Sequence, residues 1–336
     1  MKNKISIDKF NYKFIISKTP YRISLGGGGT DLPFYSDLRG GELITGAINQ
    51  YCLVLLAKRP LDKKIMVQTT ETQITDSLNE VENFIVRETL RYFRINNSIH
   101  VSSFTTIPTG IGLGTSSTFI VGIIKCISDL INKKYDKMKI AKLAHIIERK
   151  ILQIDGGIQD QYISSLGGIQ LLKVSKKGTV TAKEIRIKKN ILKDLQRHLV
   201  LVYSGQRRES KTIIKAQKHN LNSNIKIYDQ IKEIGKNSKK LLINGDIDGL
   251  GKLMDDHWKL KLKLANEISD RNLNNTYGQL KKLGSPGGKI IGAGGGGFFM
   301  MAVPHNVEKY ISNVKKLGFR YMLWKFDFDG SSIIKH

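Results

Sequence analysis

The sequence predicts an α+β fold in two domains. Its 336 residues, of which 40% are hydrophobic, are enough for one large domain or two of ordinary size. Strand and helix patterns are mixed along the chain, without the strict strand–helix repeat of a doubly wound sheet. The pattern also changes near residue 190, after which long helical segments dominate. We therefore expect an N-terminal domain over residues 1–190 and a C-terminal domain over 191–336.

The first half of the chain has mostly strand patterns. Residues 13–31 indicate a strand, a break at Pro20 and a second short strand that runs into a glycine loop. Stretches rich in β-branched or alternating residues predict strands over 41–60, 63–72 and 99–108. Apolar residues spaced three and four apart predict helices over 77–95, 116–132 and 138–152. A hairpin with a Lys-Lys-Gly turn is expected within 167–187.

The second half begins in the lysine-rich segment "IRIKKNILKDL", where we place the domain boundary. One strand within 198–210 precedes helical segments over 206–283. A glycine loop then enters another strand within 285–304. A helix over 306–317 and two strands, over 321–328 and 331–336, complete the prediction.

Positive charge is the strongest bias in the composition. Lys and Arg number 55 and Asp and Glu 29, which gives a net charge of +26. Such a charge would suit a nucleic-acid-binding protein. The lysines are scattered, however, without a long basic block or interleaved arginines and aromatics, so we expect a solvated surface and no nucleic-acid partner. The positive field would favour anionic small molecules such as nucleotides and sugar phosphates.

Apolar segments and cysteines indicate the compartment. No apolar run approaches the roughly 18 residues of a membrane-spanning helix, and residues 1–18 lack the apolar region of a signal peptide. Cys52 and Cys126 lie in apolar segments, which predicts buried free thiols rather than a disulfide. We therefore expect a cytoplasmic protein without a membrane partner.

Glycines cluster in three loops, over residues 25–31, 109–117 and 292–297. The central loop has alternate glycines and then hydroxyl residues at the start of a predicted helix: Gly110, Gly112, Gly114, Thr115, Ser116 and Ser117. A helix N-terminus offers unpaired N–H groups and a positive dipole end, which predicts a phosphate site. The hydroxyls could cap the helix, donate to phosphate or ligate Mg²⁺. No Walker lysine follows, and a flexible loop with an ordinary helix cap is the alternative.

Two carboxylates follow this loop in the sequence. Glu148 lies at the edge of the apolar face of its helix, and Asp160 comes shortly after Gly156 and Gly157. Near a phosphate site, one carboxylate could hold a divalent cation while the other orients or deprotonates a nucleophilic hydroxyl. In the structural alternative, Glu148 pairs with surface bases such as Arg149 and Asp160 caps a helix.

The first glycine loop adds a cation and a third carboxylate. Arg22 precedes this loop and could neutralise the charge of a transferring phosphoryl group. Asp31 ends the loop and could accept hydrogen bonds from sugar or polyol hydroxyls. Gly-Thr-Asp is also ordinary turn chemistry, so this pattern alone leaves both interpretations open.

Together these segments resemble the GHMP small-molecule kinase superfamily. "PYRISLGGGGTD", "PTGIGLGTSST" and "KIIGAGGGGFF" resemble its three motifs in order and spacing, over nearly the whole chain. Thr115 replaces the usual serine of the second motif and keeps the hydroxyl. "LGGGGTDLPFY", "ERKILQIDGG" and "GGIQDQYISSLGG" look most like the sugar 1-kinase branch. The resemblance implies a ribosomal-S5-like N-terminal domain, a ferredoxin-like C-terminal domain and an active site between them.

The resemblance also implies a role for each motif. ATP phosphates would bind the second motif, at Gly110, Gly112, Leu113, Gly114, Thr115, Ser116 and Ser117. Ser116 and Glu148 fall where related kinases ligate Mg²⁺. Asp160 falls at the catalytic carboxylate, and Arg22 falls where a Lys or Arg supports the reaction centre. The sugar would contact Gly28, Gly29, Thr30 and Asp31. The third loop, Gly294 to Gly297, would pack beside the phosphate loop.

The implied activity is phosphorylation of an anomeric hydroxyl with ATP and Mg²⁺. We expect D-glycero-D-manno-heptose 7-phosphate as the acceptor and its 1,7-bisphosphate as a precursor of GDP-heptose for surface polysaccharide. Arg207 and Arg208 could bind the 7-phosphate, because arginine pairs with phosphate bidentately. Lys289 is a further candidate. The alternatives are a kinase for an unphosphorylated sugar such as fucose or mannose, and a non-catalytic sugar-binding protein. Both monomer and homodimer remain open.

Overall fold

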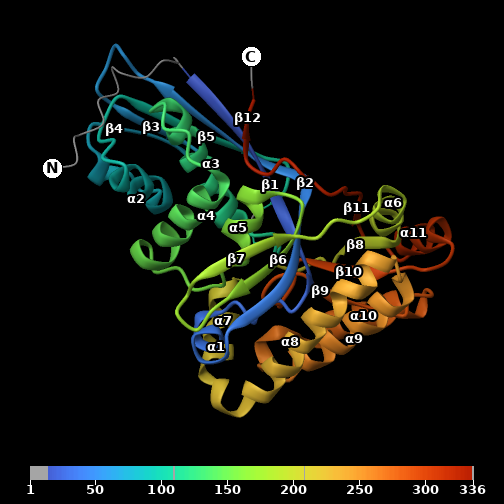
Figure 1. Ribbon diagram of the computed structural model, residues 1–336. Coiled ribbons are helices and arrows are strands. Elements are labelled where there is room, and N and C mark those ends of the chain that lie inside the picture. The colour runs from blue at the N-terminus through green and yellow to red at the C-terminus, as the bar shows by residue number, and fades with distance from the viewer. Residues whose placement is uncertain (1–13, 109, 208, 335–336) are drawn as a thin grey trace.

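The computed structural model describes residues 14–108, 110–207 and 209–334. It contains two β-sheets, with helices packed on both (Figure 1). One sheet is built mainly from the first half of the chain and the other from the second half. The predicted α+β class with two sheets is therefore confirmed.

The first sheet has eight strands, and its centre is a long antiparallel pair. This pair consists of β1 (Phe14–Gly26) and β2 (Gly41–Lys58). The remaining strands of the first half are β3 (Ile65–Gln68), β4 (Thr72–Thr75), β5 (Ile99–Thr105), β6 (Ile169–Val174) and β7 (Val180–Glu184). The expected break at Pro20 is wrong. The chain continues through a register shift between Pro20 and Tyr21, because a bulge accommodates a residue without an N–H.

The helices of the first half differ in part from those predicted. They are α1 (Pro33–Arg39), α2 (Phe84–Tyr92), α3 (Thr115–Leu130), α4 (Lys137–His145) and α5 (Gln159–Leu166). α2 is shorter than expected because Asn83 caps it, accepting a hydrogen bond from the Val86 N–H at 3.1 Å. The helix expected over 138–152 changes after α4 into a π-helical turn, Ile146–Ile151.

The second sheet has the predicted ferredoxin-like arrangement. Its spatial order is β11 (Tyr321–Met322), β8 (Leu199–Tyr203), β10 (Phe298–Ala302) and β9 (Gly287–Ile290). Between β8 and β9 the chain forms α7 (Ser210–His219), α8 (Leu221–Asn244), α9 (Ile247–Leu262) and α10 (Arg271–Lys282). α11 (Val307–Lys316) connects β10 to β11. This strand–helix–strand–strand–helix–strand order is that of a split βαβ fold.

The last residues described return to the first sheet. Phe326 forms a β-bridge with Ile48, and β12 (Ser332–Ile333) pairs with β1. The first sheet therefore contains a strand from the far side of the expected boundary. α6 (Lys189–His198) begins at that boundary. The division into residues 1–190 and 191–336 stays a prediction.

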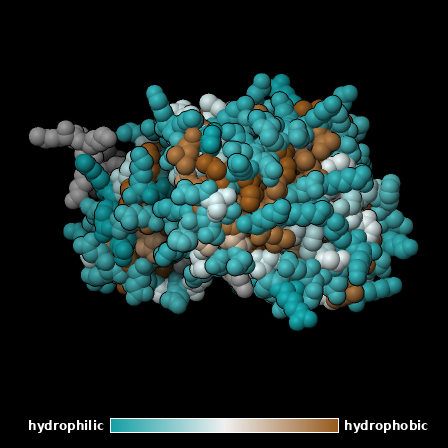
Figure 2. All heavy atoms as spheres, turned by 90° about the horizontal axis from the view of Figure 1, so that it is seen from below, coloured by the Kyte–Doolittle hydropathy of each residue, from teal (hydrophilic) through white to brown (hydrophobic). Residues whose placement is uncertain are grey.

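The apolar residues form cores that join the two halves of the chain. The largest cluster contains Ile23 and Ile44 of the first sheet together with Leu201 and Met300 of the second. Cys52 and Cys126 are buried free thiols, as predicted. On the face seen in Figure 2, hydrophilic residues cover most of the surface and hydrophobic residues gather near the middle. None of the helices in the described part of the chain is long and apolar enough to cross a membrane.

Candidate functional site

A cleft of about 730 Å³ lies where the three glycine loops meet. The loops contribute glycines that are far apart in the sequence: Gly28, Gly29, Gly110, Gly112, Gly114, Gly292, Gly294 and Gly296. Side chains from β1, α2, α3, the π-helical turn, α5, α7, α9 and β9 also line the cleft, together with the segment 152–157. The fold thus brings the three predicted loops together around one cavity.

The central loop ends at an uncapped helix. Gly110, Gly112 and Gly114 have φ values of 76°, 80° and 79°, which glycine adopts without steric cost. Gly114 is the N-cap of α3, and no side chain caps this helix. The prediction that hydroxyls of the loop cap it is therefore wrong. The N–H groups of the first turn can instead receive an anion.

The third glycine loop packs directly against the central one. A Cβ on Gly297 would lie 2.3 Å from the Ile111 carbonyl oxygen, and a Cβ on Gly292 would lie 2.8 Å from Gly112 Cα. Only glycine permits such close contact between backbones. The third loop therefore supports the central loop from the side of the second sheet, the place that the resemblance implied.

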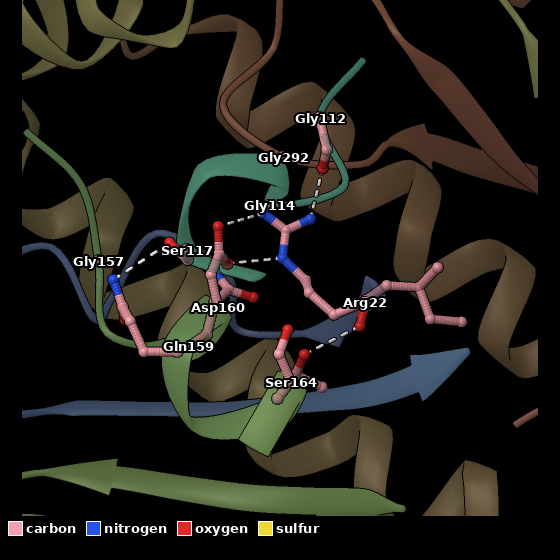
Figure 3. A network of polar contacts seen from close by, with 12 residues as sticks. Arg22, Gly112, Gly114, Ser117, Gly157, Gln159, Asp160, Ser164 and Gly292 are labelled. Carbon is pink, nitrogen blue, oxygen red and sulfur yellow. Dashed lines mark hydrogen bonds and ion pairs between the residues drawn. The ribbon is translucent and has the colours of Figure 1, made fainter. Parts of the chain in front are cut away.

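Arg22 and Asp160 form a forked ion pair in the cleft. Arg22 Nε lies 2.6 Å from Asp160 Oδ1, and Nη2 lies 3.0 Å from Oδ2. The third nitrogen donates to the Gly112 carbonyl, so the guanidinium lies between Asp160 and the central loop (Figure 3). A Cβ on Gly114 would lie 2.8 Å from Asp160 Oδ2. The carboxylate is thus held beside the N-terminus of α3.

Glu148 lies in the π-helical turn that follows α4. Such turns are frequent at functional sites. The side chain is 2% exposed. It accepts hydrogen bonds from Ser117 Oγ at 2.7 Å and from the Gln161 amide. The hydroxyl beside Glu148 is that of Ser117. Ser116, the predicted metal ligand, is exposed at the cleft.

These oxygens fit a magnesium site that the nucleotide completes. Mg²⁺ takes hard oxygen ligands and usually binds one or two carboxylates together with substrate phosphates and water. Glu148 and a neighbouring hydroxyl offer such a donor set beside the central loop. No group of three or more His, Cys, Asp or Glu side chains suited to a metal occurs among the residues described. Glu148 would therefore hold the ion only together with bound phosphate.

The first loop surrounds a buried carboxylate. Asp31 accepts hydrogen bonds from the Gln159 N–H at 3.1 Å and the Gly29 N–H at 3.2 Å. Burial raises the pKa of Asp31, and the charge of Asp160 acts in the same direction, while the Gln159 N–H opposes them. Asp31, Gly28 and Gly29 line the cleft. Asp31 is therefore fixed in place on the side where a sugar was expected.

Thr30 and Leu113 do not line the cleft, whereas Arg207 does. Thr30 is buried, and its hydroxyl donates to the carbonyls of Gly27 and Glu42, so it supports the loop. Leu113 is buried as well and offers its carbonyl to the Arg22 N–H at 3.4 Å. Arg207 is exposed at the edge of the cleft. Arg208 lies outside the described residues.

Basic residues of the second half also line the cleft, and most of them escaped the sequence analysis. His257 and Lys261 come from α9, and Lys289 comes from β9. Of these three, only Lys289 was a candidate. The available signal was helical spacing, because Met254, Trp258 and Lys261 recur on the buried face of α9. A lysine and a histidine on such a face point inward.

Comparisons with known proteins agree with this arrangement. Residues 81–168 match the N-terminal domain of GHMP kinases, and residues 238–318 match the GHMP kinase C-terminal family. A D-glycero-alpha-D-manno-heptose 7-phosphate kinase of Campylobacter jejuni subsp. jejuni is 31% identical over 87% of this chain and 90% of its own length. An L-fucokinase/L-fucose-1-P guanylyltransferase of Bacteroides fragilis is 24% identical over 89% of this chain but 36% of its own.

Solved structures share the fold. A D-glycero-D-manno-heptose 1-phosphate kinase from Bacteroides thetaiotaomicron has a TM-score of 0.80 at 24% identity, covering 96% of this chain and 99% of its own. The mevalonate kinase of Methanococcus jannaschii has a TM-score of 0.71 at 22% identity, covering 93% and 98%. Since both family domains match and a relative is 31% identical over most of its length, the chain belongs to the GHMP kinase superfamily.

Proposed function

We propose that the protein is an ATP-dependent sugar 1-kinase that phosphorylates the anomeric hydroxyl of D-glycero-D-manno-heptose 7-phosphate. The observation that carries this proposal is the Arg22–Asp160 pair beside Gly114 and the uncapped N-terminus of α3. A phosphate-binding helix end and a carboxylate for the attacking hydroxyl are what phosphoryl transfer to an alcohol requires. The named heptose 7-phosphate kinase among the relatives supports the choice of acceptor.

Asp160 would orient the anomeric hydroxyl and accept its proton. An anomeric hydroxyl is more acidic than an ordinary alcohol, which eases this transfer to a carboxylate. Arg22 holds both carboxylate oxygens, so the rotamer of Asp160 is set before substrate binds. The same guanidinium reaches the central loop and would stabilise charge on the transferring phosphoryl group.

Glu148 would hold Mg²⁺ with a hydroxyl from the first turn of α3. The resemblance favours Ser116 for this role, and the observed contact favours Ser117. When bound, the ion neutralises charge on the β and γ phosphates. The N–H groups of α3 and the loop Gly110 to Gly114 would bind the phosphates themselves. Most of the rate enhancement would come from positioning and charge neutralisation.

A panel of acceptors tests the proposal. The purified protein is assayed with ATP and Mg²⁺ on D-glycero-D-manno-heptose 7-phosphate, the same heptose without phosphate, L-fucose and D-mannose. We expect kcat/KM for the phosphorylated heptose to exceed the others by about 100-fold or more, because a site built for a charged group rejects acceptors that lack it. Preferred turnover of L-fucose or D-mannose would favour the neutral-sugar alternative. Sugar binding without any turnover would favour the non-catalytic one.

A further inference from the structure

Three basic side chains meet inside the cleft on the side of the second sheet. His257 and Lys261 are one helical turn apart on α9, and Lys289 is on β9, which packs against that helix. Their exposed fractions are 2%, 8% and 2%. All three nevertheless line the cleft. Lysine is almost never this deeply buried unless it is paired, so the group needs a physical explanation.

Among the residues that the structure describes, none is an acidic partner of these three side chains. Lys261 Nζ donates to the Gly292 carbonyl, and Lys289 Nζ lies 3.4 Å from His257 Nδ1. Across the described chain, no carboxylate comes within ion-pair distance of either lysine. The same helix compensates charge elsewhere, since Asp255 receives Lys259 at 2.7 Å and Lys281 at 2.9 Å. Lys261 is therefore an exception within its own helix.

Holding these three basic groups together without a bound anion disfavours their charged forms. Burial, and then the charge of Arg22, lowers the pKa of Lys261 to about 7. Burial also lowers the pKa of Lys289, and Lys261 and Arg22 act in the same direction. Burial also lowers the pKa of His257 well below its usual value, and the charges of Lys289 and Lys261 act in the same direction. An anion among these groups would offset both the burial and the mutual repulsion.

We propose that His257, Lys261 and Lys289 form the binding subsite for the phosphate group of a phosphorylated sugar acceptor. This inference rests on the proposed function and adds the residues that choose its substrate. The γ-phosphate of ATP is the other phosphate group that such a site could bind. The acceptor is favoured because the ATP phosphates already have the N-terminus of α3 and the Mg²⁺ that Glu148 would hold. His257, by contrast, is next to the loop expected to hold the sugar, because a hydrogen bond with the backbone of Gly28 partly offsets the lowering of its pKa by burial.

The subsite differs in kind from the site predicted on Arg207. Arg207 is exposed at the edge of the cleft, where water screens its charge. Lys261 and Lys289 are shielded from water, so a charge-assisted hydrogen bond to phosphate is stronger there. We therefore assign most of the discrimination between phosphorylated and unphosphorylated acceptors to the lysines and little to Arg207.

Neutral variants of similar shape test this assignment. Lys289→Met and Lys261→Met are compared with wild type for KM on heptose 7-phosphate, on the unphosphorylated heptose and on ATP. We expect KM for the phosphorylated acceptor to rise about 10- to 100-fold, as expected for a lost charged hydrogen bond, and the other two KM values to stay within about twofold. Lys263→Met is the matched control, because Lys263 is exposed and lies outside the cleft. It should change none of the three.

Two results would overturn the subsite. A rise in KM for ATP would assign the lysines to the γ-phosphate, and equal losses on both sugars would make them structural. A binding measurement separates this failure from failure of the proposed function. Calorimetry with inorganic phosphate, in the presence of a non-hydrolysable ATP analogue, should show binding to wild type and none to Lys289→Met. Loss of binding there supports the subsite even if heptose 7-phosphate is not turned over, and unchanged binding refutes it.

Discussion

The two walls of the cleft differ in how their charges are compensated. The first wall is formed by β1, α3, α5 and the π-helical turn Ile146–Ile151. On it Arg22 meets Asp160 in a forked pair, and Glu148 accepts from two neutral donors and lies 3.9 Å from Arg149 Nη2. The second wall is formed by α9 and β9. Its basic group, His257, Lys261 and Lys289, has no carboxylate partner among the residues described. A compensated wall can position reacting groups before substrate arrives, whereas an uncompensated one is completed by an anionic ligand. We infer that catalysis and recognition of the acceptor's phosphate group are divided between the two halves of the chain.

Removing the charge of Asp160 should have the largest effect. Asp160→Asn keeps the shape of the side chain but removes its ability to accept a proton. We expect kcat to fall by about 10²–10⁴-fold, the usual contribution of a general base, while ATP still binds. Steady-state kinetics and calorimetry with ATP measure the two quantities. A near-normal kcat would show that Asp160 is not the catalytic base, and it would contradict the assignment of catalysis to the first wall.

The second prediction concerns the metal. Glu148→Gln preserves the hydrogen bond from Ser117 but removes the charge that Mg²⁺ needs. We expect the Mg²⁺ concentration for half-maximal activity to rise about 10- to 100-fold, the size of effect seen when a metal site loses a supporting group. The measurement is a Mg²⁺ titration of activity at saturating ATP. Ser116→Ala and Ser117→Ala, titrated in the same way, show which hydroxyl contributes. An unchanged Mg²⁺ requirement in Glu148→Gln would contradict the proposed metal site.

Binding of the phosphorylated acceptor to the second wall should depend on pH. Arg22 from β1, Lys289 from β9 and His257 from α9 surround Lys261, whose pKa burial lowers to about 7. Above pH 7 the empty protein therefore loses this proton, whereas bound phosphate restores it. Binding then takes up a proton, so KM for the phosphorylated acceptor should rise about tenfold per pH unit above 7. Kinetics from pH 6 to 9 measure this slope, which Lys261→Met should abolish; persistence of the slope in that variant would refute the explanation.

The smallest expected effect is on stability. The pKa of Lys289 is lowered in the folded state, so burying its charge opposes folding. Replacing it in Lys289→Met should stabilise the empty protein by about 1–4 kcal/mol, seen as a rise of a few degrees in Tm by calorimetry at pH 7 in a buffer without phosphate. Lys263→Met should leave Tm unchanged. A lower Tm in Lys289→Met would mean that Lys289 stabilises the empty protein, which would contradict the view that its buried charge lacks a partner.

Sequence patterns could predict the first wall because its groups lie in or near continuous motifs. Glycines next to a helix start predicted a loop that runs into α3, and the residues expected at the reaction centre, Arg22 and Asp160, do meet. Spacing alone does not fix which of Ser116 and Ser117 turns toward Glu148, because adjacent helical residues point about 100° apart; in the structure Ser117 is the one that donates to Glu148. The expected break at Pro20 failed because pairing with β2 continues through a bulge.

The second wall was hard to predict because it depends on tertiary packing. Lys261 and His257 stand in a lysine-rich helix, where most lysines face solvent, as Lys259 and Lys263 do. Whether a particular lysine points inward depends on how α9 packs against β9 and which face it buries. The return of β12 to β1 is similarly non-local, since two residues near one end of the chain complete a sheet formed by the other.

The position of the new phosphate tests the central claim most directly. Wild-type protein is incubated with ATP, Mg²⁺ and D-glycero-D-manno-heptose 7-phosphate, and the product is examined by phosphorus and carbon NMR. The account predicts a 1,7-bisphosphate, with phosphorus coupling at C1 and the 7-phosphate retained. Phosphate on any other hydroxyl, or product only from sugars that lack the 7-phosphate, would contradict it.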